Sequence, residues 1–497
     1  MKNCSDRDST EMKRTSNIRY RSLLKITGWL IVFECVLMVL PLLLSVVNGD
    51  IQDIKAFAAA MAVAGVAGGL PVVLNRKESI KLNQRESYLL ISTVWIAFSL
   101  FGMLPFMMCS SPVPFADAFF EAMSGFTTTG ASVYSDVESL GKGILLWRAM
   151  IQWLGGLGIV FFLIAILPAL NNSRGTLLFN VETTGISHDK IHPHIRKTAS
   201  SLWTVYSILT LALATLLLLG GMDIFDSICV AMSTLSTGGF STRNEGIAYW
   251  HSGYIASVMT VFMIIGGINF IFIYNTVVNR FRGVWKNEVV RIFLATVLTA
   301  GAVTGFIIWT RGGEGFNDLV LSPLFHVSSA ITSTGFSYSD FGTWGNASLA
   351  ITMMLMICGA CAGSTSGGIK IDRIAVMFKT LRSEITYTLF PNHLNRITVG
   401  DRSVDQRNLV RILAFCAFYI LITGVGALLM SAFGYDLTDS FFASASCIGN
   451  SGLGYGTTAA GYGGLPGSLK MFLSFEMLVG RLEIFTVFVL FYKSFWK

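Results

Sequence analysis

The chain has 497 residues, of which 53% are hydrophobic and only 13% are charged. Soluble proteins carry about 25% charged residues, so this share cannot cover the roughly three soluble domains that the length would suggest. The net charge is +7. The composition indicates a membrane protein and argues against a cytosolic enzyme or a nucleic-acid-binding protein.

Apolar segments long enough to cross a bilayer recur along the chain. A crossing needs about 20 apolar residues, and the first segment is too long for a signal-peptide core, so we expect it to be retained. The ten predicted spans are residues 23–47, 55–75, 88–108, 145–170, 199–220, 252–279, 289–310, 348–380, 407–433 and 468–495. Shorter apolar segments, at 115–126, 223–235, 318–331 and 437–448, have a length typical of re-entrant segments.

Lys and Arg are unevenly distributed between the loops. The N-terminal tail and the loops or linkers near 76–85, 174–197, 280–286 and 370–411 are basic, whereas the intervening loops are poor in cations and carry acidic residues. Cytoplasmic loops are enriched in Lys and Arg. The pattern therefore predicts that both termini are cytoplasmic and that the four short segments enter the membrane from outside.

The four short apolar segments end in similar sequences, which indicates an internal repeat. In register, these sequences run from Ser124 to Gly130, from Ser233 to Gly239, from Ser329 to Gly335 and from Ser446 to Gly452, with glycine always six residues after serine. The repeated unit is a span, a short pore helix, a glycine loop and a second span. We predict an all-α polytopic membrane protein with four such pseudo-repeats around one central pore, preceded by two extra spans.

The chemistry of the glycine loops points to an ion pathway. Non-helical backbone at membrane depth is tolerated where it is buried in protein or lines a water-filled cavity. Glycine readily adopts left-handed angles that can turn carbonyl oxygens toward an axis, where they replace the hydration shell of a monovalent cation. The pore helices would direct their negative C-terminal ends toward that ion. A secondary porter with broken helices and a membrane-embedded enzyme are the alternatives.

The four loops, the run GACAGSTSGGIK at 359–370 and the run GRLEIF at 480–485 resemble the potassium-uptake subunits of the Trk/Ktr/HKT superfamily, and most closely the TrkH type, over about residues 85–495. The resemblance implies a potassium filter formed by Thr128, Thr129, Gly130, Thr237, Gly238, Gly239, Ser333, Thr334, Gly335, Asn450, Ser451 and Gly452. The fourth loop departs most from the pattern. Serine at the first-loop glycine is associated with sodium transport in the plant branch, so Gly130 favours potassium.

Residues 359–368 interrupt the predicted span 348–380. They are rich in Gly, Ser and Thr, which are poor helix formers, so we expect a helix break and a loop that projects into the pore; a continuous flexible helix is the alternative. By resemblance this loop is an intramembrane gate formed by Gly359, Gly363, Ser364, Thr365, Ser366, Gly367 and Gly368 together with Arg481. Arg481 lies near the centre of the last predicted span, where an unpaired charge is expensive, and we expect it to bind carbonyl groups of this loop.

The chain divides into segments with distinct expected roles. They are a cytoplasmic tail (1–22), two extra spans (23–84), repeat 1 (85–170), a cytoplasmic linker (171–198), repeat 2 (199–282), repeat 3 (283–380), a second linker (381–406) and repeat 4 (407–497). With no nucleotide-binding motif visible, we expect a homodimer in the inner cell membrane whose linkers bind a separate TrkA-like nucleotide-binding regulatory subunit. The resemblance implies K⁺ as the transported ion, and we expect neither a resident cofactor nor catalytic residues.

Overall fold

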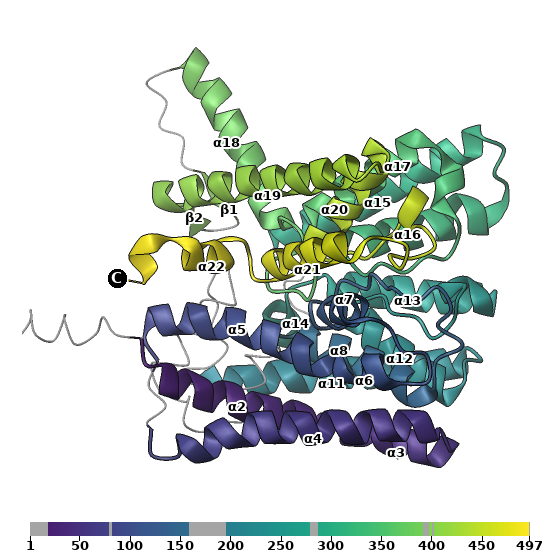
Figure 1. The fold of residues 1–497 in the computed structure, drawn as a ribbon. Coiled ribbons are helices and arrows are strands. Elements are labelled where there is room, and N and C mark those ends of the chain that lie inside the picture. The colour runs from purple at the N-terminus through teal and green to yellow at the C-terminus, as the bar shows by residue number, and fades with distance from the viewer. Residues whose placement is uncertain are drawn as a thin grey trace, which may run out of the picture.

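The structure is a computed structural model that describes residues 18–78, 82–158, 195–278, 287–390, 397–399 and 402–496. These residues are almost entirely helical, and the helices lie side by side (Figure 1). A short antiparallel ladder pairs β1 (Thr398–Val399) with β2 (Arg402–Ser403). Most of the predicted tail and of the linker 171–198 lies outside the described residues, as does part of the linker 381–406.

The two extra N-terminal spans are present and pack on each other along one side of the molecule (Figure 1). They consist of α2 (Tyr20–Leu37) with α3 (Val39–Asn48), and of α4 (Ile51–Leu74). Two glycines face each other across the pair, and a Cβ on Gly28 would lie 2.6 Å from the carbonyl oxygen of Gly68. Small residues at such a contact allow the close backbone approach that stabilises helix pairs in membranes.

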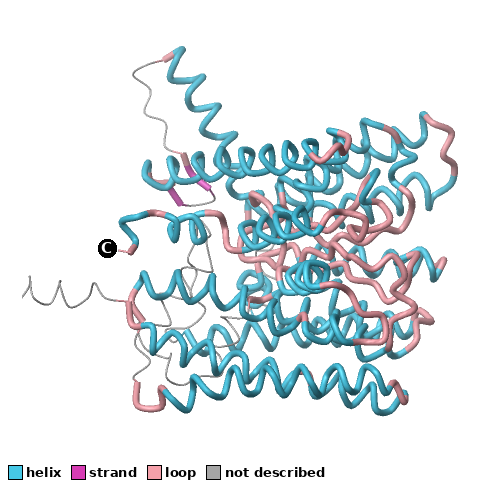
Figure 2. Tube along the Cα trace, viewed as in Figure 1, coloured by secondary structure: helices cyan, strands magenta, loops and turns pink. Residues whose placement is uncertain are grey.

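Each of the four predicted repeats begins with a long helix followed by a short one. The long helices are α5 (Gln84–Gly102), continued by α6 (Leu104–Met108), then α11 (Ile195–Leu219), α15 (Glu288–Thr310) and α19 (Gln406–Ala432). The pore helices are α7 (Phe115–Phe126), α12 (Ile224–Leu235), α16 (Ser322–Ile331), which follows a π-helical turn at Asn317–Leu321, and α20 (Leu437–Ile448). The connecting loops gather in the interior between the helices (Figure 2).

The second helix of each repeat ends far sooner than a full span requires. These helices are α8 (Lys142–Gly156), α13 (Gly253–Gly266), α17 (Asn346–Cys358) and α21 (Gly467–Arg481), and the last three are followed by α14 (Phe270–Val278), α18 (Ile371–Leu389) and α22 (Phe485–Phe488). The prediction of one continuous helix is wrong for 252–279, where α13 and α14 meet at 102°, and for 468–495. In the predicted span 145–170, α8 ends at Gly156, and residues 159–170 lie outside the described residues. Only the break within 348–380 was expected. Within the described part of the chain, six helices are long and apolar enough to span a membrane, or seven if α13 and α14 form one span.

Two of the breaks, in the first and fourth repeats, have a common feature that could not be predicted from the sequence. At the end of α8, a Cβ on Gly155 would collide with the carbonyl oxygen of Phe126, the last residue of its pore helix. Gly480 of α21 has the same relation to Ile448. In the first and fourth repeats the second helix therefore passes so close to the end of its own pore helix that only glycine fits there.

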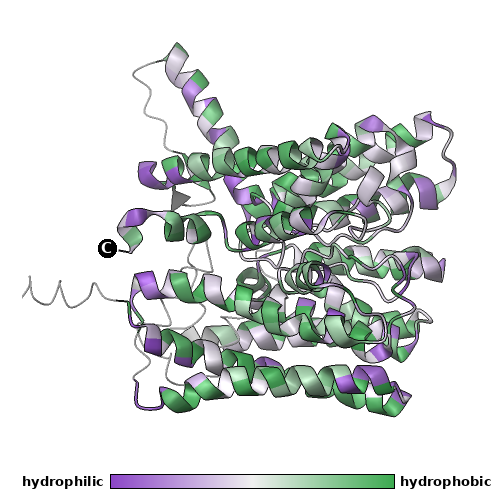
Figure 3. Ribbon diagram, in the orientation of Figure 1, coloured by the Kyte–Doolittle hydropathy of each residue, from purple (hydrophilic) through white to green (hydrophobic). Residues whose placement is uncertain are grey.

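Hydrophobic residues predominate along the middle of the helices, and hydrophilic residues are more frequent toward both ends (Figure 3). Val66 of α4, Leu211 of α11 and Leu428 of α19 are large apolar residues with exposed side chains. Burial in lipid accounts for such exposed residues. Short 3₁₀ turns complete the described structure, at Gly246–Trp250, Phe341–Trp344, Gly456–Thr458, Val489–Phe491 and Lys493–Phe495.

Candidate functional site

The four pore helices end in the same backbone motif. The second residue after each helix has a left-handed φ: +57° at Thr128, +54° at Thr237, +53° at Ser333 and +51° at Asn450. The next residue donates its N–H to the carbonyl of the serine that opens the motif, at 2.8 Å from Thr129 to Ser124, from Gly238 to Ser233 and from Thr334 to Ser329, and at 2.9 Å from Ser451 to Ser446. This pattern is a Schellman cap. It explains why the four sequences align without a gap.

The glycine that follows each cap meets the neighbouring loop. A Cβ on Gly130 would collide with the carbonyl oxygen of Gly238, on Gly239 with that of Thr334, on Gly335 with that of Ser451, and on Gly452 with that of Thr129. The contacts run from loop 1 to 2, 3, 4 and back to 1. They form a closed cycle, so the four loops surround one axis, with carbonyl groups packed against the glycines.

Side chains link the loops as well. Within loop 1, the hydroxyls of Thr127 and Thr129 lie 2.8 Å apart. In loop 4 an asparagine replaces the threonine pattern, and Asn450 Nδ2 donates to Thr129 Oγ1 at 3.0 Å and to the Met477 carbonyl at 2.9 Å. The asparagine in the fourth loop, which departs from the sequence pattern of the other three, therefore forms a direct hydrogen bond between the last loop and the first.

Gln152 of α8 holds the second loop and was given no role from the sequence. Its Nε2 donates to the carbonyl of Gly238 at 2.6 Å, and its Oε1 accepts from the N–H of Phe240 at 3.1 Å. Because one buried amide binds both sides of Gly239, it fixes the position of this loop. The signal available in the sequence was an uncharged polar residue within an apolar helix.

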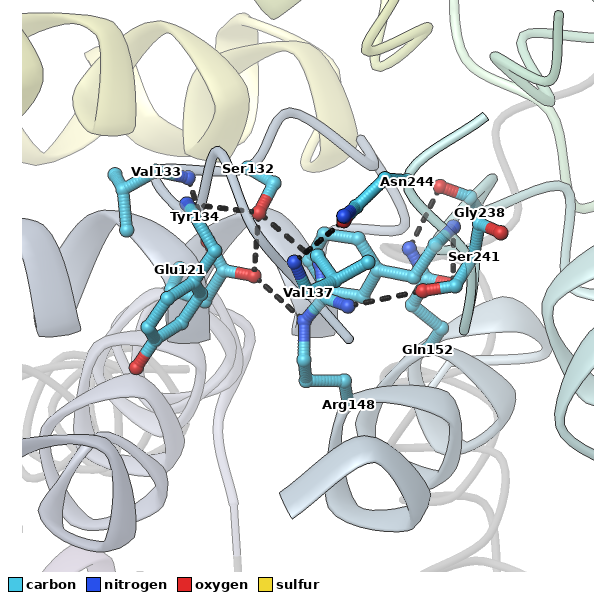
Figure 4. A network of polar contacts seen from close by, with 11 residues as sticks. Glu121, Ser132, Val133, Tyr134, Val137, Arg148, Gln152, Gly238, Ser241 and Asn244 are labelled. Carbon is cyan, nitrogen blue, oxygen red and sulfur yellow. Dashed lines mark hydrogen bonds and ion pairs between the residues drawn. The ribbon is translucent and has the colours of Figure 1, made fainter. Parts of the chain in front are cut away.

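A buried ion pair joins the first two loops (Figure 4). Arg148 Nε of α8 donates to Glu121 Oε1 of α7 at 2.8 Å, and the two side chains are 2% and 0% exposed. Arg148 also donates to the Ser241 carbonyl at 3.1 Å and to Ser132 Oγ at 3.0 Å. Glu121 accepts the N–H of Val133 at 2.8 Å. Arg148 was given no role from the sequence, although two charges within apolar helices are a recognisable signal.

Residues 359–368 form a closed loop between α17 and α18. Gly359 and Gly368, the first and last residues of the loop, contact each other, and both have a left-handed φ. The N–H groups of Ile369 and Lys370 bond to the carbonyls of Ile357 and Cys358 at 3.0 and 2.9 Å. The expected helix break is therefore present, and the chain returns beside the point where it left.

The tip of this loop touches three of the four pore loops. Thr237 Oγ1 lies 3.1 Å from Thr365 Oγ1, and the N–H of Gly367 donates to Ser333 Oγ at 3.0 Å. A Cβ on Gly367 would collide with the carbonyl oxygen of Gly449. Ser364 and Ser366 stay within the loop, their hydroxyls 2.9 Å apart.

The break in the second repeat holds the other side of the loop. Asn269 Nδ2 donates to the Ala362 carbonyl at 2.8 Å, and the N–H of Phe270 donates to the Gly363 carbonyl at 3.1 Å. Gly363 has a left-handed φ and no room for a Cβ beside Asn269. The loop is therefore enclosed by the pore loops on one side and by the 267–269 break on another.

Arg481 binds the loop from the fourth repeat. Its guanidinium donates to the carbonyls of Thr365 and Gly156, both at 2.7 Å, and also to that of Gly155. The expected contact with a carbonyl of 359–368 is present. The expected mid-helix position is wrong, because α21 ends at Arg481, and left-handed φ angles at Glu483 and Ile484 follow.

A charged cluster that the sequence analysis did not identify lies at the start of α18. Lys370 bonds to the carbonyl of Ser366 through its ammonium group, and Asp372 Oδ2 accepts the N–H of Ala362 at 2.8 Å. Arg373 pairs with Glu483, just beyond the break after α21. These residues tie the end of the loop to the fourth repeat.

The fold and these loops define a multi-span membrane transport protein. The chain belongs to the TrkH family of cation transport proteins, whose family model matches residues 53–309 and 316–497. Membership in this family excludes the membrane-embedded enzyme.

Known relatives match nearly the whole chain. The Trk system potassium uptake protein TrkH of Escherichia coli is 33% identical, over 97% of this chain and 100% of its own length. TrkG of the same organism is 34% identical, over 86% and 89%. The crystal structure of the potassium transporter TrkH from Vibrio parahaemolyticus superposes with a TM-score of 0.88 at 30% identity, covering 97% of this chain and 100% of that one.

Proposed function

We propose that this chain is the ion-conducting subunit of a potassium uptake system in the cell membrane, with both termini in the cytoplasm. Its relatives are named as potassium uptake proteins. The observation that carries the proposal is the closed cycle of four loops, in which every glycine abuts a carbonyl of the next loop. A ring of carbonyl oxygens can replace the hydration shell of a monovalent cation.

The filter in this proposal consists of residues 128–130, 237–239, 333–335 and 450–452. The C-terminal ends of four pore helices lead into these loops, and their partial negative charges favour a cation. The acidic loops expected on the outer side would concentrate cations at the entrance. Gly130 in the first loop favours potassium over sodium.

The gate in this proposal is the loop 359–368 together with Arg481. The loop contacts three pore loops, and the arginine binds it to the end of α8. A fixed positive charge beneath the filter raises the barrier for a passing cation. Conduction then requires that the loop and Arg481 move apart from their present partners.

Substitution of Gly130 tests the filter. Gly130→Ser keeps a small side chain but places a Cβ against the Gly238 carbonyl, so we expect rubidium-over-sodium selectivity in liposome flux to fall about tenfold or more. Gly221→Ser is the matched control, because Gly221 also has a left-handed φ but has no atom within 4 Å of its Cβ position. If both variants keep the parent's selectivity, the filter is misassigned. Failure of the parent to support potassium-limited growth of an uptake-deficient cell would contradict the function itself.

A sodium-permeable or ion-coupled porter of the same fold is the second candidate. The observation that favours coupling is the buried group of titratable side chains at the gate, Lys370 and Asp372. Rubidium flux in liposomes at several pH values and sodium gradients separates the two. A passive pathway follows the rubidium gradient alone, whereas a porter also responds to the second gradient.

The proposed partners are a second copy of this chain and a TrkA-like nucleotide-binding subunit at the linkers 171–198 and 381–406. Helix α18 extends away from the other helices (Figure 1). It exposes an apolar stripe at helical spacing, formed by Phe378, Leu381, Ile385 and Leu389. Such a stripe fits a helix–helix contact between copies. The double variant Phe378→Ser with Ile385→Ser should therefore convert a dimer in detergent to a monomer.

The regulatory subunit has a separate test. If the chain alone showed ion flux that responds to nucleotide, the proposal of a separate nucleotide-binding subunit would be contradicted.

A further inference from the structure

A second buried acidic residue near the pore, Glu476 of α21, has surroundings unlike those of Glu121. Its side chain is 0% exposed, and it points into the space that Gly426 of α19 leaves free, where a Cβ would collide with its Oε1. Its Oε1 lies 3.0 Å from Ser444 Oγ of the pore helix α20. Its Oε2 has no hydrogen-bond partner among the described residues.

Ser444 Oγ lies within hydrogen-bond distance of two acceptor atoms but has a single hydrogen. Ser444 Oγ lies 3.0 Å from Glu476 Oε1 and 3.0 Å from the carbonyl oxygen of Thr423. A hydroxyl has one hydrogen, and a backbone carbonyl can only accept. If Ser444 donates to Thr423, the bond to Glu476 exists only when the carboxyl carries the proton and donates it to Oγ.

The neighbouring helices supply no positive charge for an ionised Glu476. The titratable groups that interact with it from α19 and α20 are Tyr419 and Cys447, which bear no positive charge. On α7, which also packs on α21, Asp117 is paired with Lys470 and Glu121 with Arg148. A buried carboxylate without a cation costs several kcal/mol, so such a group stays neutral.

The fourth repeat lacks the ion pair of the first. By the register of the pore loops, Ala443 corresponds to Glu121, and by the register of the helix breaks, Leu473 corresponds to Arg148. The bond between Glu476 and Ser444 instead joins the second helix of this repeat to its pore helix. The adjacent Met477 carbonyl binds Asn450 of the loop itself.

We propose that Glu476 is a positioning residue that acts as a protonated carboxylic acid, holding α20 against α21 and so fixing the fourth filter loop relative to the other three. The filter role rests on the proposed function, whereas the protonation state does not. A neutral donor suits this place, since a net negative charge behind one of four loops would disturb an ion site that the four share.

Two substitutions of Glu476 test the proposal. Glu476→Gln keeps a neutral donor toward Ser444, so it should retain the parent's rubidium-over-sodium selectivity and pH profile. Glu476→Leu fills similar volume without a donor and should lower that selectivity about three- to tenfold. Glu121→Gln is the matched control: the same change at a paired carboxylate should impair the protein. Equal loss of selectivity in both Glu476 variants would overturn the positioning role.

Infrared spectroscopy tests the protonation state independently of transport. The parent should show carbonyl stretches of protonated carboxylic acids, and Glu476→Gln should remove one component of them that Glu121→Gln leaves; Glu34, whose carboxyl group is also buried without a hydrogen-bond partner among the described residues, can supply another component. A difference spectrum between the parent and Glu476→Gln that contains no such component overturns the protonated acid. If the parent conducts no rubidium, the proposed function fails while the infrared difference still decides the state of Glu476.

Discussion

The pore loops and the helix breaks each occur four times, yet only the loops keep one geometry. All four loops share the left-handed residue, the cap bond and the glycine-to-carbonyl contact. The breaks read GGLG at 155–158, GGIN at 266–269, CGAC at 358–361 and GRLE at 480–483. The break at 266–269 bends the chain by 102°, the break at 358–361 begins the loop 359–368, and the break at 480–483 carries Arg481.

Under the proposed function, the difference reflects what each region has to do. A filter surrounds an ion on the axis evenly only if its four loops are equivalent, so each loop constrains the others. A gate in the pathway, as proposed for the loop 359–368, is needed once, and its supports can come from any neighbour. Arg481 stands where the other breaks have Gly156, Gly267 and Gly359, so only the fourth repeat carries a charge at this position.

The largest effect on stability is expected at the buried ion pair that joins the first two pore loops. Arg148→Met leaves Glu121 buried without its cation and should lower the free energy of unfolding by about 3–5 kcal/mol, measured by thermal denaturation in detergent. The double variant Glu121→Leu with Arg148→Met should recover part of this loss. A single variant as stable as the parent would show that the pair does not hold the first two loops together.

The largest effect on ion flux is expected at the fourth helix break, which carries Arg481. If Arg481 lies about 5 Å from the proposed ion path, removal of its unit charge at an effective dielectric constant of about 20 lowers the barrier by on the order of 3 kcal/mol. Arg481→Gln and deletions within 363–367 should therefore raise rubidium flux about tenfold or more in the absence of any partner, with little change in selectivity. Arg411→Gln, at an exposed position of α19, is the control. Flux no greater than that of the parent in folded variants would contradict the gating role.

A smaller effect is expected at Gln152, because it supports one loop only. Gln152→Leu leaves the Gly238 carbonyl and the Phe240 N–H without their partner, which costs about 1–3 kcal/mol. We expect rubidium-over-sodium selectivity in liposomes to fall about fivefold. Met150→Leu on the same helix conserves volume and should be tolerated. Equal selectivity in the two variants would show that loop 2 keeps its shape without the amide.

The smallest effect is expected at the partly exposed pair of the second repeat. Arg243 lies 2.9 Å from Asp226, and its side chain is 30% exposed. Pairs of this kind contribute about 0.2–1 kcal/mol, so Arg243→Gln should shift the thermal midpoint far less than Arg148→Met. If Arg243→Gln lowered the thermal midpoint as much as Arg148→Met, the exposed pair would contribute as much to stability as the buried pair, which would contradict this ranking.

Much of the architecture could be predicted because it depends on local composition. Hydrophobic length indicated the first helices of the repeats, and the serine-to-glycine spacing indicated the four loops, since a Schellman cap needs a fixed number of residues. Helix ends that depend on contacts with neighbouring helices were harder to predict from the sequence. Gly155 and Gly480 mark the breaks only because a pore helix passes beside them, and this contact is invisible in a single sequence. The predicted tail and the linker 171–198 fall largely outside the described residues.

The sequence by itself determined the membrane location, the four-unit plan and the residues of the loops, because hydrophobic length, glycine and capping patterns act within a few residues of the chain. Only the tertiary structure decided which groups meet. Gln152 reaches Gly238 across 86 positions, Arg481 reaches Gly156 across 325, and Glu476 meets Ser444 across two helices. Such pairs form because a buried polar group away from water has to find a partner wherever the packing brings one.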